Sequence, residues 1–277
     1  MAPFQKILFP TDFSDASKAM AAEVRAMAER CRAEVTVLHS FDVVPSFYLA
    51  GREEASLPVP YTVWAREMRT DALQRLEQFA RDWMAGIQHR VTLEDGDPAV
   101  AIPTVAERSG ADLIMMATNG AGRFRRLLMG SVAAKVLHDT GCAVFTSAHE
   151  PPPETPRLAG FRKILCGVEW NQEAERILEF ARSFAQFWGA GVWVVHMAHR
   201  GEKPPGGEIE DLVQRLRLQA RVRVVHANVA EGIRNAALVV SADLVIIGRG
   251  KDRGRISRLW SEVYEIIRES PCPVLSI

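Results

Sequence analysis

The sequence predicts an α/β protein made of two tandem, doubly wound domains, each with a five-stranded parallel sheet. Short apolar strand patterns alternate with longer segments in which apolar residues recur every three or four positions. This alternation implies parallel strands joined by right-handed helical crossovers. The same order of strands and helices begins again after residue 160, and 277 residues are enough for two domains of ordinary size.

The first strand and helix are marked by clear boundary residues. The apolar run at residues 6–9 is interrupted by Pro10. Ser14 or Asp15 can then cap a helix, because short polar side chains accept hydrogen bonds from the free N–H groups of a first turn. The predicted buried face of this helix consists of Met20, Val24, Met27, Ala28 and Cys31.

The rest of the first half continues the alternation. Further strands are predicted at residues 34–39, 89–94, 112–116 and 143–146. Further helices are predicted at residues 62–84, 98–108 and 131–139. Asp97 followed by Pro98 is typical of an N-cap and a first helical position, which supports the start of the second of these helices.

Segments of the first half recur in the second. Residues 4–8 (FQKIL) return as residues 161–165 (FRKIL) at an offset of 157, and residues 111–114 (ADLI) return as residues 242–245 (ADLV) at an offset of 131. The smaller offset means that the second copy lacks 26 residues between its second and fourth strands. Asn171 is the expected cap of the first helix in this copy.

The proline-rich segment at residues 151–156 separates the two copies and has the composition of a linker. We therefore expect a first domain at residues 1–148, a linker at 149–160 and a second domain at 161–277. The last strands of the two domains, residues 143–146 and 274–277, are expected to pair within the chain, and a homodimer is a further expectation.

Composition and charge favour a cytoplasmic protein without a charge-driven partner. The 34 basic and 34 acidic residues cancel, so nothing favours nucleic acid or an anionic membrane surface. No apolar run approaches the roughly 20 residues of a membrane span, and the first residues lack a signal-peptide core. Four scattered cysteines are expected to be buried thiols rather than zinc ligands or disulfides: Cys31, Cys142, Cys166 and Cys272.

A glycine-containing loop is the main candidate for a ligand site. The predicted strand at 112–116 leads into this loop, and the chain enters the next helix at Gly130 and Ser131. Free backbone N–H groups at such a helix start can bind an anion. Gly130 allows close approach to the backbone, and Ser131 offers a hydroxyl. The pattern predicts a phosphate site, while taken alone it also fits a plain crossover turn.

Several motifs resemble the universal stress protein family. They are KILFPTDFS at residues 6–14, GDP at 96–98, ADLIMMATNG at 111–120 and GSV at 130–132. The match runs through both repeats, so the chain resembles the tandem form, and the resemblance implies a Rossmann-like fold of the adenine nucleotide alpha hydrolase type. The nucleotide-binding pattern of the family has glycine at its first position, where this chain has Ala117; Gly120, Gly130 and Ser131 keep the other three.

The resemblance implies that the first domain binds ATP, with or without magnesium. The residues implied for adenine and ribose are Pro10, Thr11 and Asp12; those beside the base or sugar are Ser40 and Met116; those for the phosphates are Asn119, Gly120, Gly130, Ser131 and Val132. A carboxylate such as Asp12 accepts hydrogen bonds at the carboxyl edge of a parallel sheet, where ligands bind. The methyl group of Ala117 costs little at negative φ and much at positive φ.

The second copy departs further from this pattern. Glu169 stands at the position of Asp12, Gly167 at that of Pro10, Lys251 at that of Gly120 and Trp260 at that of Gly130. An indole at the helix entrance would fill the phosphate space, so we expect this domain to bind no nucleotide and to act as a pseudo-dimer partner. A solvated basic rim is expected at Arg123, Arg125, Arg126, Arg249, Lys251, Arg253 and Arg255.

The leading interpretation is a stress-type regulatory protein that binds ATP in its N-terminal domain. A slow ATPase and a nucleotide-free dimerisation scaffold are the alternatives. No Walker A spacing, no His-x-Gly-His signature and no Ser-Gly-Gly loop is present, and no catalytic or metal-binding residue is predicted. His39 and His196, at equivalent strand ends, are expected to make structural hydrogen bonds.

Overall fold

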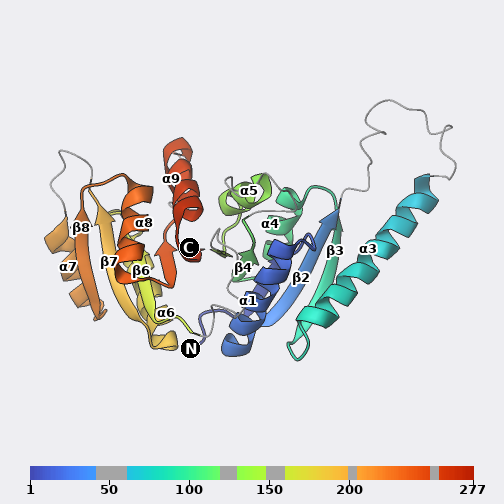
Figure 1. The fold of residues 1–277 in the computed structure, drawn as a ribbon, viewed down its shortest axis with the longest axis horizontal. Coiled ribbons are helices and arrows are strands. Elements are labelled where there is room, and N and C mark those ends of the chain that lie inside the picture. Colours follow the sequence, from blue (N-terminus) through green and yellow to red (C-terminus); the bar gives the residue numbers. More distant parts are fainter. Residues whose placement is uncertain (42–60, 119–129, 148–159, 199–204, 250–255) are drawn as a thin grey trace.

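Ten strands form one continuous sheet in the order β3-β2-β1-β4-β5-β10-β9-β6-β7-β8. The computed structural model describes residues 1–41, 61–118, 130–147, 160–198, 205–249 and 256–277 (Figure 1). The strands are β1 Lys6–Pro10, β2 Glu34–Phe41, β3 His89–Asp95, β4 Leu113–Met116, β5 Ala143–Thr146, β6 Lys163–Gly167, β7 Gly191–Met197, β8 Ala220–Val225, β9 Leu244–Ile247 and β10 Val274–Ser276.

Helices cover both faces of this sheet. They are α1 Asp15–Cys31, α3 Tyr61–Trp83, α4 Pro98–Ser109, α5 Ser131–Asp139, α6 Ala174–Trp188, α7 Gly206–Arg215, α8 Val229–Val240 and α9 Ile256–Glu269. Residues of α1, α3, α6 and α7 belong to one apolar core, and residues of α4, α5, α8 and α9 belong to the other. Each core therefore runs through both halves of the chain.

Each half has the predicted doubly wound topology. The order is β3-β2-β1-β4-β5 in the first half and β8-β7-β6-β9-β10 in the second, and every strand pair within a half is parallel. The fold class expected from the sequence is confirmed. The predicted buried face of α1 is also confirmed, since all five of its apolar residues are buried.

Helix starts agree with the sequence in the first half and differ in the second. The Ser14 side chain accepts a hydrogen bond from the Ser17 N–H, and the Asp97 side chain accepts one from the Ala99 N–H, as N-caps do. The prediction that Asn171 caps the first helix of the second half is wrong. Its side-chain Oδ1 accepts a hydrogen bond from the Glu173 N–H, and helix α6 begins only after Glu173. Asn171 thus closes a local turn ahead of the helix.

The two halves meet through the expected pairing of their last strands. Strand β10 runs antiparallel to β5, with Leu275 opposite Phe145. Both side chains have no exposed surface. Hydroxyl groups add to the pairing at both ends, because Thr146 donates to the Val274 carbonyl and Ser276 donates to the Val144 carbonyl, each at 3.3 Å. The domain bounds 1–148 and 161–277 stay a prediction, since most of the linker lies outside the described residues.

Arg249 provides a second link between the halves and corrects one prediction. Its guanidinium donates to the carbonyl oxygens of Leu137 and Thr140, at 3.0 and 3.1 Å, and to that of Cys142. These carbonyls lie at the C-terminal end of α5, where a positive charge is favourable. Arg249 is thus a partly buried interdomain contact, and its expected place on a solvated rim is wrong. The other residues expected on that rim lie outside the described ranges.

All four cysteines are free thiols, as expected, and three of them are buried. Burial raises the pKa of Cys31 to about 11 and that of Cys166 to about 12, which keeps both protonated at neutral pH. Among the helices in the described ranges, none has the length and apolar character required to cross a bilayer.

The strand junction generates a stability prediction. Leu275→Ala should lower the free energy of unfolding by about 2 to 5 kcal/mol, because it leaves a cavity where the two sheets join. Leu238→Ala is the matched control, since that side chain on α8 is 52% exposed and its loss should change the value by less than about 0.5 kcal/mol. Urea denaturation measures both. Equal effects of the two substitutions would contradict the assigned role of the junction.

Candidate functional site

A cavity of about 290 Å³ lies where the chain leaves β1 and β4. The strands adjacent to β1 are β2 and β4, and this is the point in a doubly wound sheet where successive crossovers go to opposite faces. The volume is just below the usual range for small-molecule sites, about 300 to 1,000 Å³. The fold therefore offers a ligand-sized space at the location typical of its class.

The structure brings nine of the predicted nucleotide residues together around this cavity. They are Pro10, Thr11, Asp12, Ser40, Met116, Ala117, Gly130, Ser131 and Val132. The other two, Asn119 and Gly120, lie outside the described residues. The ligand-binding role of each residue remains a prediction.

Further residues around the cavity were not predicted as site residues from the sequence. They are Ser17, Leu38, Pro98, Ile102, Thr118 and Ala133. Pro98 carried a usable signal, because the Asp97–Pro98 cap begins a helix directly after β3, at the carboxyl edge of the sheet. Ser17 carried a weaker signal, because it is a polar residue close to the buried face of α1.

The N-terminus of α5 forms one wall of the cavity. Gly130 is the N-cap, with φ −63° and ψ 147°, and its N–H donates to the Thr118 carbonyl at 2.8 Å. The next three residues, Ser131, Val132 and Ala133, all line the cavity. Backbone N–H groups in the first turn of a helix have no acceptor within the helix, and the helix dipole makes this end positive. This wall is suited to an anion such as a phosphate group.

Ala117 leaves the cavity open. It is described by the structure and is not among the residues with positive φ. A methyl group at this backbone conformation introduces no strain of the kind that glycine avoids. Alanine in place of the family's glycine at this position therefore costs little, as expected for a residue without positive φ.

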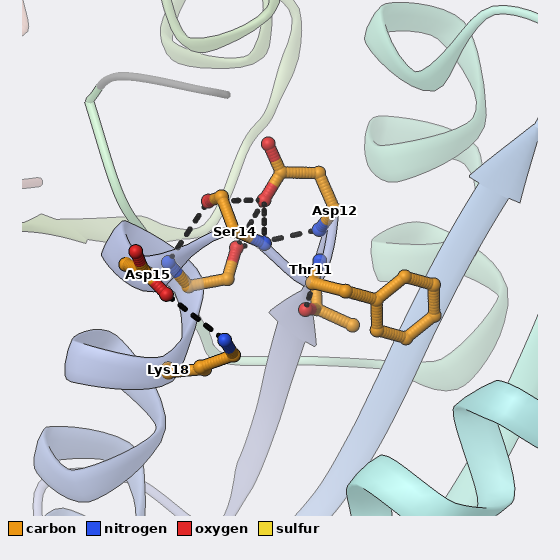
Figure 2. Close-up of polar contacts among 7 residues, drawn as sticks. Thr11, Asp12, Ser14, Asp15 and Lys18 are labelled. Carbon is orange, nitrogen blue, oxygen red and sulfur yellow. Dashed lines mark hydrogen bonds and ion pairs between the residues drawn. The ribbon is translucent and has the colours of Figure 1, made fainter. Parts of the chain in front are cut away.

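Asp12 also lines the cavity, and several hydrogen bonds hold its side chain. Its Oδ1 accepts from the Ser14 N–H at 3.0 Å, from Ser14 Oγ at 2.5 Å and from Ser17 Oγ at 2.6 Å. Figure 2 shows Asp12 and Ser14 facing each other where the chain passes from β1 into α1. The turn thus places a carboxylate at the cavity with its orientation fixed.

Phe13, the next residue, adopts a left-handed backbone conformation with φ 61°. Its ring lies 4.4 Å from that of His39 and 5.5 Å from that of Phe79, and the Arg75 guanidinium lies over it at 4.5 Å. A non-glycine residue in this region is strained by about 1 to 3 kcal/mol and persists only where its surroundings hold it. The packing around Phe13 supplies that support.

His39 and His196 have the structural role expected for them. His39 Nδ1 is 2.8 Å from the Thr11 carbonyl oxygen, and His196 Nδ1 is 2.9 Å from the Val168 carbonyl oxygen. Burial lowers the pKa of His39, so the ring is neutral at neutral pH and its Nδ1–H donates to the carbonyl. Each histidine thus links its own strand, β2 or β7, by a hydrogen bond to the turn that follows the adjacent strand, β1 or β6.

The equivalent space in the second half is smaller, about 100 Å³. Isoleucine side chains occupy it at two points. A Cβ atom added to Gly167, the counterpart of Pro10, would lie 3.1 Å from Ile233 Cδ1; one added to Gly248, the counterpart of Ala117, would lie 2.4 Å from Ile177 Cδ1. Trp260 belongs to α9, but its side chain lies outside the described part of the structure. Apolar packing therefore narrows this space independently of Trp260.

Comparisons with known proteins agree with this architecture. A universal stress protein from Methanocaldococcus jannaschii is 33% identical over 141 residues, which cover 51% of this chain and 80% of that protein. One from Mycobacterium bovis is 22% identical over 251 residues, covering 80% and 83%. The crystal structure of a universal stress protein from Archaeoglobus fulgidus matches 99% of this chain and 96% of its own, with a TM-score of 0.71 and 23% identity.

The likeness to the Archaeoglobus structure shows that the fold is shared along nearly the whole chain. Family membership has separate evidence in the sequence. The sequence model of the universal stress protein family matches residues 3–146, which is more than half of the chain. This protein therefore belongs to the universal stress protein family.

Proposed function

We propose that the protein binds ATP in its N-terminal half and that this binding serves regulation rather than catalysis. One observation carries the proposal: the cavity beside β1 and β4 is lined both by an oriented carboxylate, Asp12, and by the positive end of α5. A nucleotide has hydroxyl and amino donors at one end and phosphates at the other. Asp12 can accept hydrogen bonds from those donors, and the N–H groups at the start of α5 can bind the phosphates.

The roles of the lining residues follow from their chemistry. Asp12 accepts hydrogen bonds from ribose hydroxyls or adenine N–H groups, while Leu38, Ile102 and Met116 provide apolar surface for the base or sugar. The N–H groups at the start of α5 and the Ser131 hydroxyl bind the phosphates. Magnesium would enter with the phosphates, since this ion usually takes few ligands from the protein itself.

Adenine nucleotides are ligands of other universal stress proteins. Solved structures include a universal stress protein in complex with cAMP and one from Archaeoglobus fulgidus in complex with dAMP. The proposal for this chain depends on its own cavity.

The C-terminal half acts in this proposal as a partner that binds no nucleotide. Its cavity has about one third of the volume of the first, and isoleucine side chains occupy positions beside its strand ends. Arg249 is the counterpart of Thr118 in the glycine loop, and its guanidinium contacts α5 of the other half. The role of the second half is then to support α5 and to cover the edge of the first sheet.

The first prediction concerns stoichiometry. Isothermal titration should give one ATP per chain, and Asp12→Ala should weaken binding about 10- to 100-fold because a charged hydrogen-bond acceptor is lost. Glu169→Ala, at the equivalent position of the second half, is the matched control and should leave the affinity unchanged. Two sites per chain, or equal losses in both variants, would contradict the assignment to the first half.

The second prediction concerns the entrance to α5. Gly130→Trp should abolish ATP binding, because an indole at the N-cap would fill the phosphate end of the cavity. Gly130→Ala is the control: an added Cβ would lie 3.4 Å from the Thr118 carbonyl oxygen, and φ is −63°, so the methyl fits without backbone strain. Binding should be measured by titration and folding by circular dichroism. Unchanged binding in a folded Gly130→Trp variant would rule out this phosphate site.

A further inference from the structure

We infer that Ser17 is a positioning residue of the nucleotide site, which acts by holding the Asp12 carboxylate toward the cavity. This inference rests on the proposed function and deepens it. It assigns a role to a residue outside the motif pattern used to predict the site. The argument depends on the hydrogen bonds of one buried hydroxyl group and on a comparison between the two halves of the chain.

The Ser17 hydroxyl contacts both the side chain and the main chain of Asp12. It donates to Asp12 Oδ1 at 2.6 Å and accepts from the Asp12 N–H at 3.3 Å. Ser17 itself is 5% exposed and lines the cavity. One hydroxyl in the first turn of α1 therefore fixes both the backbone and the carboxylate of a residue five positions earlier.

Ser14 completes the set. It donates twice to the same carboxylate oxygen, through its N–H and its hydroxyl, and its Oγ accepts from the Ser17 N–H at 3.2 Å. Because Ser14 is also the helix cap, the carboxylate is tied to the start of α1. Asp12 is an exposed residue, and an exposed side chain without such contacts samples several rotamers. Orientation before binding reduces the entropy that binding must overcome.

The second half lacks this hydroxyl. Ala174 stands at the position of Ser17, Glu169 at that of Asp12 and Asn171 at that of Ser14. Asn171 Nδ2 donates to Glu169 Oε2 at 3.0 Å, and Ala174 has no side-chain donor. The half with the smaller cavity is thus the half without the positioning serine. Alanine at the first turn of α6 also shows that this position accepts alanine in the fold.

The test is a double-mutant cycle with ATP as the ligand of the full-length chain. Ser17→Ala should weaken ATP binding about tenfold, the loss expected for one hydrogen bond to a charged group. In an Asp12→Ala background the same substitution should change the affinity less than about twofold, because the side-chain acceptor that the hydroxyl positions is gone. Equilibrium dialysis at millimolar ATP measures the weaker variants.

The matched control is Ser109→Ala, which removes another partly buried helical hydroxyl, bonded to the Val105 carbonyl at 2.7 Å and distant in sequence from Asp12. It should leave the affinity unchanged. Unchanged affinity of Ser17→Ala, or a tenfold loss that persists in the Asp12→Ala background, would overturn the inference while leaving ATP binding intact. Failure of the unmodified chain to bind ATP would instead overturn the proposed function.

Discussion

The antiparallel pairing of β5 with β10 is the constraint on which the arrangement of the whole molecule depends. Without it, β5 and β10 would each be an edge strand with unpaired backbone N–H and C=O groups and with exposed apolar side chains such as Phe145 and Leu275. Such edges favour uncontrolled association. With it, the ten strands become one sheet, and both apolar cores extend across the junction. The second half is therefore required by the packing of the first, whatever it binds.

This requirement gives the second half a structural role that does not depend on any ligand. Packing at the junction restricts Phe145 and Leu275 independently of what either cavity holds. In the first half, the Thr118 carbonyl accepts a hydrogen bond from the Gly130 N–H. Its counterpart in the second half is Arg249, whose guanidinium donates to the Leu137 carbonyl of the first half. A position that borders the larger cavity in the first half makes a contact between the halves in the second.

Local features of the fold, the pairing of the last strands and the grouping of nine site residues could be predicted from the sequence. Side-chain contacts between distant segments could not. The Asp97 cap and the limits of α5 follow from residues next to one another, and both predictions were confirmed. The Asn171 cap was wrong because the same side chain favours two competing local turns. Arg249 was misplaced because its charge is visible in the sequence but its burial depends on carbonyl groups more than 100 residues away. Ser17 was missed because a serine in a first helical turn is ordinary unless its partner is known.

Backbone strain at Phe13 occurs only in the half with the larger cavity, among the described residues at this turn. Phe13 has positive φ, whereas its counterpart Trp170 does not and is 40% exposed. Strain of this kind costs free energy, so its persistence requires either packing that offsets it or a function that needs the geometry. Packing on His39 and Phe79 offsets the strain, but it does not explain why the turn is built this way. The conformation of Phe13 sets the direction of the chain directly after Asp12, where the carboxylate must meet the first turn of α1. We therefore connect the strained turn with the position of that carboxylate rather than with the stability of the sheet.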